Sequence, residues 1–333
     1  MKILYGVQGT GNGHLSKVSS IYPILNDFTD NIDILISGDN YGISINYPIK
    51  YQKKGITFKV KNGKIDYLNS FINFNLFRFF KEINSIPFNK YDLIITDFEP
   101  ISAWGAKKHN IPSVHVSHQA SFLDENVPFP KKKDFLGNLI LKNFIPKMEY
   151  VGIHFQQYSP NICTPLIKKS ILNAKITYGN HFTLYLPWYE NKFLVDFFQN
   201  FKNENFHIFT KKVTKEKVFE NITLFPVSEK KFSKSMSSSK GVICNAGFVT
   251  PSEALYLGKR LLVIPLKGQY EQHCNVAALE KIGVLSISNL NYKNLKIIDD
   301  WFYSKPIQLR KKTKIRKLLK QKIISLILIN NAL

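Results

Sequence analysis

The stretch CNAGFVTPSEAL, residues 244–255, joins an expected buried strand at 241–244 to an expected helix at 250–257. Gly247 permits a tight turn between these two elements. Thr250 is followed by a proline, which is typical of the first turn of a helix. Because the N-terminus of a helix attracts anions, this stretch predicts a site where backbone N–H groups hold a diphosphate without a metal ion.

A second group of polar side chains follows the next expected strand, at 261–264. Glu271, Gln272 and Asn275 belong to an expected helix at 271–281, which starts at the same edge of the sheet. Glu253 is expected on the first turn of the preceding helix, where its carboxylate can accept hydrogen bonds from two sugar hydroxyls. The residues expected to bind a ligand at this edge are Gly247, Phe248, Thr250, Glu253, Gln269, Glu271, Gln272 and Asn275.

Strand and helix patterns alternate along the rest of the chain. This order predicts an α/β fold with parallel sheets that are covered on both faces. Strands are expected at 2–7, 32–36, 91–96, 113–117, 183–186 and 206–209, and helices at 14–27, 71–83, 101–109 and 192–201. Residues 120–133 are expected to form a loop, 158–180 a crossing between domains, and 233–239 a surface loop. We divide the chain into two domains, 1–165 and 166–304, and a basic amphipathic helix within 305–333.

A glycine-rich loop, GVQGTGNGH at residues 6–14, follows the first expected strand. It lacks the third glycine of a dinucleotide-binding fingerprint and the lysine of a P-loop. His14 closes the loop at the start of a helix, so it either caps that helix or acts as a general base, because imidazole titrates near neutral pH. The other loop residues expected to approach a ligand closely are Gly9, Thr10, Gly11, Asn12 and Gly13.

The motif TDFEP, residues 96–100, ends another buried strand. Ligands of open α/β sheets bind beyond the carboxyl ends of the strands, so Asp97 is expected in the same cleft as His14. A carboxylate bonded to the far nitrogen of a histidine fixes its tautomer and stabilises the imidazolium. Two other interpretations remain: Asp97 caps the next helix, or Asp97 and Glu99 form an acidic metal-binding pair.

Taken together, these motifs resemble those of the GT-B glycosyltransferases, and in particular family 28, which includes the transferase of peptidoglycan lipid assembly. The resemblance is carried by GTGNGH, by TDFEP with the later VSHQ, and by NAGFVTPSEAL with IPLKGQYEQHCN. It implies two Rossmann-like domains whose parallel sheets face an interdomain cleft. It also implies that Gly247 and Thr250 approach the diphosphate, that Glu253 holds the ribose, and that Glu271 and Gln272 hold the donor sugar.

The same resemblance suggests that His118 and Gln119 contact the acceptor. The sequence departs from the family pattern at Arg260, where the family usually has proline. Glu271 stands where the peptidoglycan enzyme has glutamine, so the donor sugar of that enzyme cannot be assumed here.

The chain of 333 residues carries a formal net charge of +22, and most of the excess lies in its second half. Nine Lys and Arg residues fall between Lys305 and Lys322, in a segment whose helix at 309–327 would be amphipathic. This helix either packs on the domains or contacts an anionic membrane surface. The basic charge itself reflects either a bias of composition or attraction to acidic lipid or nucleic acid.

The composition is typical of a globular cytoplasmic protein. No apolar run approaches the roughly 18 residues that a membrane span needs, and the three cysteines have no metal-ligand spacing. We therefore expect reduced thiols, no metal and no cofactor beyond a nucleotide sugar, and a cytoplasmic location that extends to the inner face of the membrane as a peripheral protein.

The expected reaction is an inverting transfer of a sugar, from a UDP-sugar or another nucleotide diphosphate sugar, to a hydroxyl of a glycan or lipid-linked acceptor. His14 would deprotonate that hydroxyl and Asp97 would orient His14. One rival is a sugar-nucleotide epimerase on the same fold, which would act without an acceptor. The other is a non-enzymatic, basic nucleic-acid-binding protein. We do not expect nucleic acid as a partner, because the sequence contains no recognised reading motif.

Overall fold

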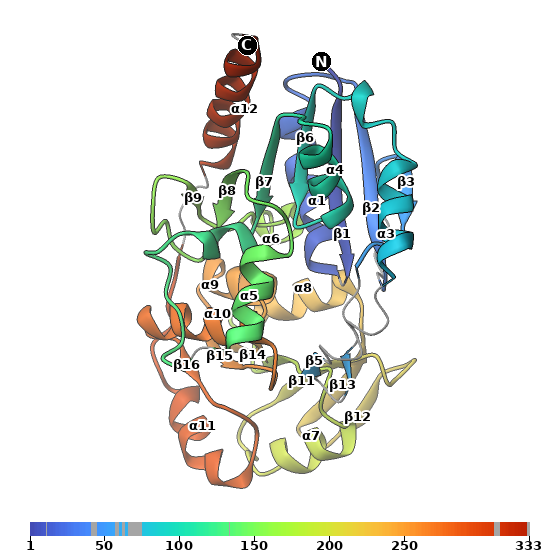
Figure 1. The fold of residues 1–333 in the computed structure, drawn as a ribbon. Helices are drawn as coiled ribbons and strands as arrows, with labels where there is room; N and C mark the ends of the chain where they lie inside the picture. Colours follow the sequence, from blue (N-terminus) through green and yellow to red (C-terminus); the bar gives the residue numbers. More distant parts are fainter. Residues whose placement is uncertain are drawn as a thin grey trace.

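The computed structural model describes residues 1–10, 12–40, 45–56, 60–61, 64–65, 75–132, 134–309 and 314–331. For residues 12, 39–40, 60–61, 64–65 and 329–331, it describes the backbone alone. Within these residues, two seven-stranded sheets lie one above the other (Figure 1), accompanied by a small hairpin of β4 (Val60–Lys61) and β5 (Lys64–Ile65). The α/β class and the two-sheet architecture agree with the sequence prediction.

The strands of the N-terminal sheet have the order β3-β2-β1-β6-β7-β8-β9, and every neighbouring pair is parallel. All seven strands therefore present their carboxyl ends at the same edge of the sheet, where ligands of such sheets bind. The strands are β1 (Ile3–Thr10), β2 (Ile32–Asn40), β3 (Ile49–Lys53), β6 (Leu93–Asp97), β7 (Ser113–Ser117), β8 (Glu149–Ile153) and β9 (Ile162–Cys163).

Alternation along β1 explains how both faces of this sheet are covered. Ile3, Tyr5 and Val7 point to one face, where they join the core formed with α1 (Asn12–Leu25). Leu4 points to the other face and packs with α3 (Leu76–Asn84) and α4 (Pro100–Lys108). Helix α1 follows β1 directly, so its N-terminus lies at the carboxyl edge of the sheet.

The C-terminal sheet has the order β12-β13-β11-β10-β14-β15-β16, and only the pair β12–β13 is antiparallel among the strands described. Helices α7 and α11 contribute to the core on one face, and α8, α9 and α10 to the core on the other. The strands are β10 (Phe182–Tyr185), β11 (Phe206–Thr210), β12 (Lys217–Phe219), β13 (Ile222–Pro226), β14 (Gly241–Asn245), β15 (Arg260–Ile264) and β16 (Leu285–Ser286). The helices are α7 (Asn191–Phe198), α8 (Glu229–Ser238), α9 (Val249–Tyr256), α10 (Tyr270–Lys281) and α11 (Leu295–Phe302).

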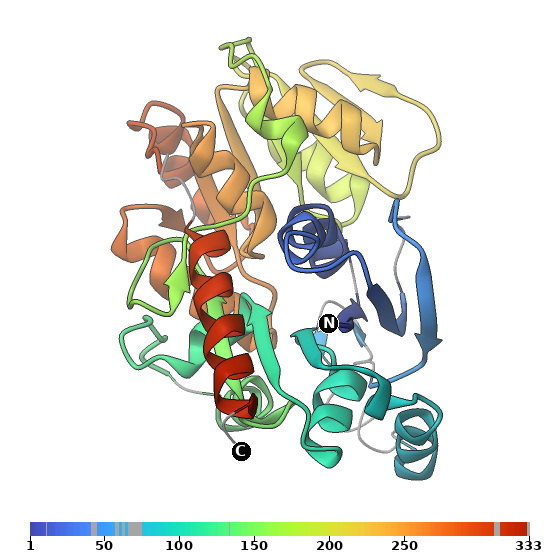
Figure 2. The same cartoon turned by 90° about the horizontal axis from the view of Figure 1, so that it is seen from above.

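The last helix, α12 (Ile315–Asn331), returns to the N-terminal half of the chain (Figures 1 and 2). Its residues Ile315, Leu319 and Ile323 are buried in the core that contains α1, and the helix contacts β7 and β8. Lys322 also pairs with Glu149 at 2.6 Å. The apolar stripe of the tail is thus used for packing, as one of the two sequence interpretations proposed; residues 310–313 of the expected helix lie outside the described residues.

Several local predictions were wrong. Residues 233–239 do not form a surface loop, because most of them belong to α8 with Ser233, Ser235 and Ser237 buried. Small serines allow this helix to approach β10, and the Ser237 hydroxyl donates to the Lys234 carbonyl one turn earlier. The expected loop at 120–133 begins with a 3₁₀ helix, Gln119–Leu123, and its residue 133 lies outside the description. The expected crossing at 158–180 contains β9 and α6 (Lys169–Leu172).

The expected helix at 71–83 corresponds to α3, which begins at Leu76; residues 71–74 are outside the described part of the chain. The sequence prediction also omitted strands β3, β8, β12, β13 and β16 and helices α5 (Phe135–Asn143), α8 and α11. Most of these strands lie towards the edges of their sheets, where a strand is short and only partly buried and its periodic signal is weak.

Candidate active site

His14 and Asp97 form a hydrogen-bonded pair at the carboxyl edge of the N-terminal sheet. Asp97 ends β6, which pairs with β1, and His14 lies in the first turn of α1, which follows β1. His14 Nδ1 is 2.7 Å from Asp97 Oδ1, the Asp97 side chain is fully buried, and 12% of the His14 side chain is exposed. An ionised carboxylate only accepts hydrogen bonds, so Nδ1 carries the proton and Nε2 has the free lone pair of a base.

Lys17 is a third member of this group that the sequence analysis missed. Its Nζ donates to Asp97 Oδ1 at 2.7 Å, and the lysine is almost completely buried. Burial alone would raise the pKa of Asp97, but Lys17 and His14 outweigh it and lower that pKa below its usual value. The available signal was the spacing from His14 to Lys17, because residues three apart share a helix face.

The two alternative roles considered for Asp97 are not supported. Glu99, not Asp97, caps α4, since its carboxylate accepts from the backbone N–H groups of Ile101 at 2.8 Å and Ser102 at 2.6 Å. The Glu99 side chain also accepts from Ser37, so it turns away from the partners of Asp97. Among the described side chains, no group of three or more His, Cys, Asp or Glu residues is arranged to hold a metal ion.

The N-terminus of α1 faces the N-terminus of α9 across the cleft between the two sheets. A Cβ added at Gly13 would lie 3.9 Å from Val249 Cγ2. A small pocket between these helices is lined by Lys17 and Ser16 from α1 and by Val249 and Ser252 from α9, among others. The starts of α1 and α9 therefore lie close together across this cleft.

Gly247, just before α9, borders open space. A Cβ added there would meet no atom within 4 Å, and the φ of Gly247 is not positive. The expected tight turn therefore does not require glycine. The opening beside Gly247 is instead suited to the close approach of a ligand to the backbone. Thr250, next along α9, is partly exposed.

The structure shows only local contacts for the remaining residues of the glycine-rich loop that it describes. Thr10 ends β1 and accepts a hydrogen bond from Gln8 at 2.7 Å, and the backbone of Gly9 lies against Gly38. Gly11 lies outside the described residues, and Asn12 is described only as the first residue of α1.

Glu253 lies in the second turn of α9, not the first, and it is 3% exposed. Its carboxylate pairs with Lys168 Nζ at 3.2 Å, a partner that the sequence analysis did not identify. Burial raises the pKa of Glu253 to about 7, although Lys168 opposes this shift. A ligand hydroxyl would therefore have to share Glu253 with Lys168.

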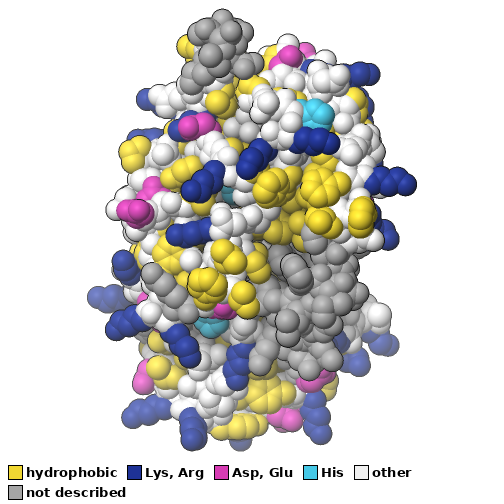
Figure 3. Space-filling view, in the orientation of Figure 1, with side chains coloured by type: hydrophobic (Ala, Val, Ile, Leu, Met, Phe, Trp, Pro, Cys, Tyr) yellow, Lys and Arg dark blue, Asp and Glu magenta, His cyan; other side chains and the backbone are white. Residues whose placement is uncertain are grey.

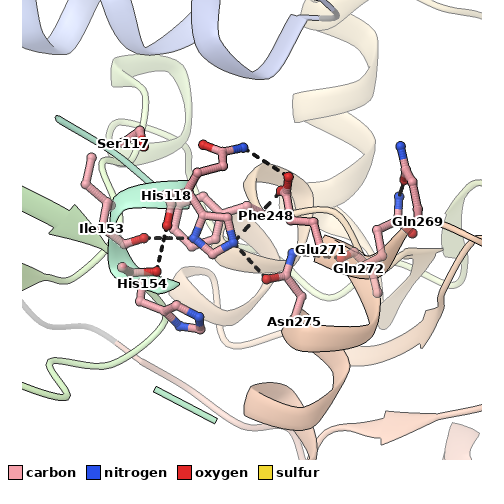
Figure 4. A network of polar contacts seen from close by, with 12 residues as sticks. Ser117, His118, Ile153, His154, Phe248, Gln269, Glu271, Gln272 and Asn275 are labelled. Atoms are coloured by element: carbon pink, nitrogen blue, oxygen red, sulfur yellow. Dashed lines mark hydrogen bonds and ion pairs between the residues drawn. The ribbon is translucent and has the colours of Figure 1, made fainter. Parts of the chain in front are cut away.

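Side chains from the two halves of the chain meet at the other side of the cleft (Figure 4). His118 Nε2 is 2.7 Å from Asn275 Oδ1, and the imidazole stacks on Phe248 with 3.9 Å between the ring centres. Gln119 Nε2 donates to Glu271 Oε2 at 3.0 Å. We call these five residues the interlobe network. His118 and Gln119 thus contact expected donor-site residues rather than a separate acceptor surface.

Gln269 and Gln272 stabilise the loop that leads into α10. Gln272 Oε1 accepts from the backbone N–H of Leu266 at 3.0 Å, and Gln272 Nε2 donates to Gln269 Oε1. Both ends of the Gln272 amide are therefore occupied. Glu271, whose side chain is 32% exposed, is more accessible to a ligand than Gln272.

Comparison with protein families gives a match over residues 1–306 to the model described as Glycosyl transferase family 1. The chain belongs to this family. It is therefore a glycosyltransferase and an enzyme, which sets aside a non-enzymatic nucleic-acid-binding protein. No match was found among curated proteins.

Solved structures of glycosyltransferases share the GT-B fold of this transferase. MurG of Acinetobacter baumannii is 15% identical, with a TM-score of 0.56 over 98% of this chain and 94% of that chain. UGT2 of Phytolacca americana, complexed with UDP-2fluoro-glucose and pterostilbene, is 13% identical, with a TM-score of 0.58 and coverage of 98% and 94%. UGT71G1 of Medicago truncatula, complexed with UDP-glucose, is 13% identical, with a TM-score of 0.56 and coverage of 96% and 93%. At these identities the likeness establishes the fold.

On the face of the transferase that Figure 3 shows, the basic side chains are scattered and do not form one continuous stripe. Figure 3 shows Lys and Arg side chains around the whole outline of this face. Within the described part of the chain, no helix is long and apolar enough to cross a membrane.

Proposed function

We propose that the transferase moves a sugar from a UDP-sugar to a hydroxyl of a glycan or lipid-linked acceptor, with inversion and without a metal ion or cofactor. The observation that carries this proposal is the position of the His14–Asp97 pair opposite the start of α9. A general base and an anion-binding helix terminus then flank one cleft, as direct displacement of a nucleotide diphosphate requires.

In the proposed mechanism, His14 Nε2 takes the proton of the acceptor hydroxyl while its Nδ1–H remains bonded to Asp97. The acceptor oxygen forms a bond to the anomeric carbon as the bond from that carbon to the diphosphate oxygen breaks. Attack opposite the leaving group inverts the anomeric configuration. Asp97 stabilises the imidazolium that forms, and this carboxylate is already held in its ionised form.

The leaving diphosphate gains negative charge as the bond breaks. Backbone N–H groups at the start of α9, next to Gly247 and Thr250, are suited to stabilise it, because they are directed at the ligand and need little rearrangement. Glu253 would bind the ribose hydroxyls, in competition with Lys168, and Glu271 would bind the donor sugar. Two structures of the same fold are complexed with UDP-2fluoro-glucose and with UDP-glucose, which supports a UDP-sugar as the donor.

A lipid-linked acceptor would lie at an anionic membrane surface, such as the inner face of the cytoplasmic membrane. The buried stripe of α12 is unavailable for this contact. Lys317 and Lys320 are exposed on the other side of this helix and can make an electrostatic contact with anionic lipid. Sedimentation with anionic and neutral vesicles, at low and high salt, tests this part of the proposal.

The main test is a thermal-shift screen against nucleotide sugars, followed by a transfer assay with the donor that binds. We expect stabilisation by one class of UDP-sugar and a product whose anomeric configuration, read by NMR, is opposite to that of the donor. NMR of the donor incubated alone separates transfer from epimerisation. Conversion of the donor to an isomer without acceptor, or retention of configuration, would contradict the proposal.

A further inference from the structure

Asp97 Oδ1 receives hydrogen bonds from two groups of α1 that lie on the same helix face. His14 Nδ1 and Lys17 Nζ are each 2.7 Å from this one oxygen. A His–Asp pair acting as a base needs only the first of these contacts. Burying an ammonium beside the pair costs desolvation energy, so its presence requires an explanation.

The other titratable groups that face Asp97 cannot replace Lys17 as a charge. Tyr5 from β1 is completely buried, and burial and then Asp97 raise its pKa well above the usual value. His115 from β7 is also buried, which lowers its pKa to about 3. Both side chains are therefore neutral near pH 7. Among the described residues that face Asp97, Lys17 is thus the one whose charge is independent of the His14 proton.

Lys17 also faces the pocket at the start of α9. This pocket is lined by Lys17 together with Phe248, Val249, Ser252 and Glu253. Lys168, which pairs with Glu253, also lines it. The Glu253 pKa of about 7 makes that carboxyl a source of pH dependence that any test must separate from Lys17.

We propose that Lys17 is a positioning residue, which holds Asp97 ionised and aligned on His14 and keeps the His14 imidazole neutral and ready to accept a proton. This inference rests on the proposed role of His14 as the base. A carboxylate alone would favour the imidazolium, which has no lone pair to accept the acceptor proton. A nearby ammonium opposes a second positive charge, so Lys17 offsets the effect of Asp97 on His14.

The test follows the titration of the His14 imidazole by NMR in the free protein, with the signal assigned from a His14→Gln variant. Lys17→Met removes the charge and retains the aliphatic stem. Lys17→Gln removes the charge but retains a hydrogen-bond donor for Asp97. In both variants we expect the titration midpoint of His14 to move upward by about one pH unit or more. Lys17→Arg, which retains the charge, should move it much less.

Lys50→Met is the matched control. Lys50 also pairs with a carboxylate at 2.7 Å, that of Asp33, but this pair lies at the amino edge of the sheet, away from the cleft. We expect no change in the His14 titration in this variant. Circular dichroism establishes which variants are folded, and Lys17→Gln is the variant to use if Lys17→Met does not fold.

The acid limb of the pH profile of kcat/KM supplies the second measurement. It should move to higher pH in Lys17→Gln and Lys17→Met by the same amount as the NMR midpoint. A shift due to Glu253 would appear in the profile but not in the His14 signal. If the titration midpoint of His14 is unchanged in folded Lys17→Met and Lys17→Gln, the inference is overturned, even if the wild type transfers sugar. A shifted midpoint in a protein that transfers no sugar would instead overturn the proposed function alone.

Discussion

His118 Nε2 lies 2.7 Å from Asn275 Oδ1, and this hydrogen bond joins the two halves of the chain. The other ring nitrogen, Nδ1, bonds to the carbonyl of Ile153 at 2.8 Å, and both side chains are buried. Burial lowers the pKa of His118, so the ring is neutral and carries a single N–H, which it can donate to either the Ile153 carbonyl or Asn275 Oδ1. The cleft is therefore closed on this side by specific contacts as well as by packing.

Replacing His118 by phenylalanine should retain the stacking on Phe248 and lose the N–H that the ring donates. The oxygen that accepts this N–H, either Asn275 Oδ1 or the Ile153 carbonyl, would be left buried without this donor, at a cost of about 1–3 kcal/mol. Chemical denaturation should show this loss as a lower free energy of unfolding. His109→Phe, at an exposed position, is the control and should change stability little. Equal stability of the two variants would mean that the interlobe hydrogen bonds contribute nothing.

Replacing His14 by alanine tests the proposed base. We expect turnover to fall by about 10²- to 10⁴-fold, which is the usual contribution of general-base catalysis. Nucleotide affinity, measured by calorimetry, should be nearly unchanged, because His14 lies on α1 of the N-terminal half and the proposed nucleotide site lies at the start of α9. Unchanged turnover would reject His14 as the base.

Replacing Glu253 by glutamine should alter the pH dependence of stability. The folded state holds the Glu253 proton up to a pKa of about 7, against 4.5 for the unperturbed group. The folded state thus loses stability relative to the unfolded chain as the pH rises from about 4.5 to 7. Glutamine does not titrate, so the difference in unfolding free energy, variant minus wild type, should grow over this range by an amount on the order of a few kcal/mol.

Denaturation series at pH 4.5, 6 and 8 would measure this difference for Glu253→Gln. Asp33→Asn is a useful comparison, because Asp33 has a lowered pKa: burial raises it, but bonds from Lys50 and Tyr91 outweigh that effect. Its contribution is complete above the ordinary aspartate pKa of 3.8 and is lost only below it, so the difference for Asp33→Asn should stay nearly constant over these three pH values. A difference for Glu253→Gln that is constant with pH would contradict the raised pKa.

Alanine substitutions at two glycines separate folding from binding. A Cβ at Gly6 would lie 2.0 Å from the hydroxyl of Ser102, which is buried and hydrogen-bonded, so Gly6→Ala should cost about 1–3 kcal/mol of stability. A Cβ at Gly247 would meet no atom within 4 Å. Gly247→Ala should therefore melt like the wild type and bind UDP more weakly. Unimpaired UDP binding by a folded Gly247→Ala variant would place the diphosphate elsewhere.

Truncation of buried side chains on α12 tests whether the tail is part of the fold. Leu319 is fully buried in the core that contains α1, so Leu319→Ala should destabilise the protein by about 2–5 kcal/mol. Leu328 on the same helix is 64% exposed, and Leu328→Ala should remain within about 0.5 kcal/mol of the wild type. A small effect at both positions would indicate that α12 detaches readily in solution.

The central strands and the site loops could be predicted from the sequence because their signals are local. Strands β1, β6, β14 and β15 each contain a run of mostly apolar residues, as strands buried on both faces do. The prediction of a loop at the serine-rich residues 233–239 was wrong because it too depended on local composition alone. Local composition favours a loop, and only packing against β10 explains the buried face of α8.

The residues that the sequence analysis missed in the site act through partners that are distant along the chain. Lys17 bonds to Asp97 across 80 residues, and Lys168, in the segment between β9 and β10, pairs with Glu253. A lysine on a helix pattern is typical of a solvated face, so its charge gave no indication of burial. Likewise, nothing in the sequence around His118 and Gln119 indicated their contacts with α10.

The sequence by itself determined the alternation of strands and helices, the two glycine-bearing helix starts, and the candidate pair of histidine and aspartate, because each depends on residues close together in the chain. Only the tertiary structure decided which charges meet. It placed Lys17 beside that pair, paired Lys168 with Glu253, and buried the apolar stripe of α12. The physical reason is that burial and ion pairing depend on how distant segments pack, which local periodicity does not encode.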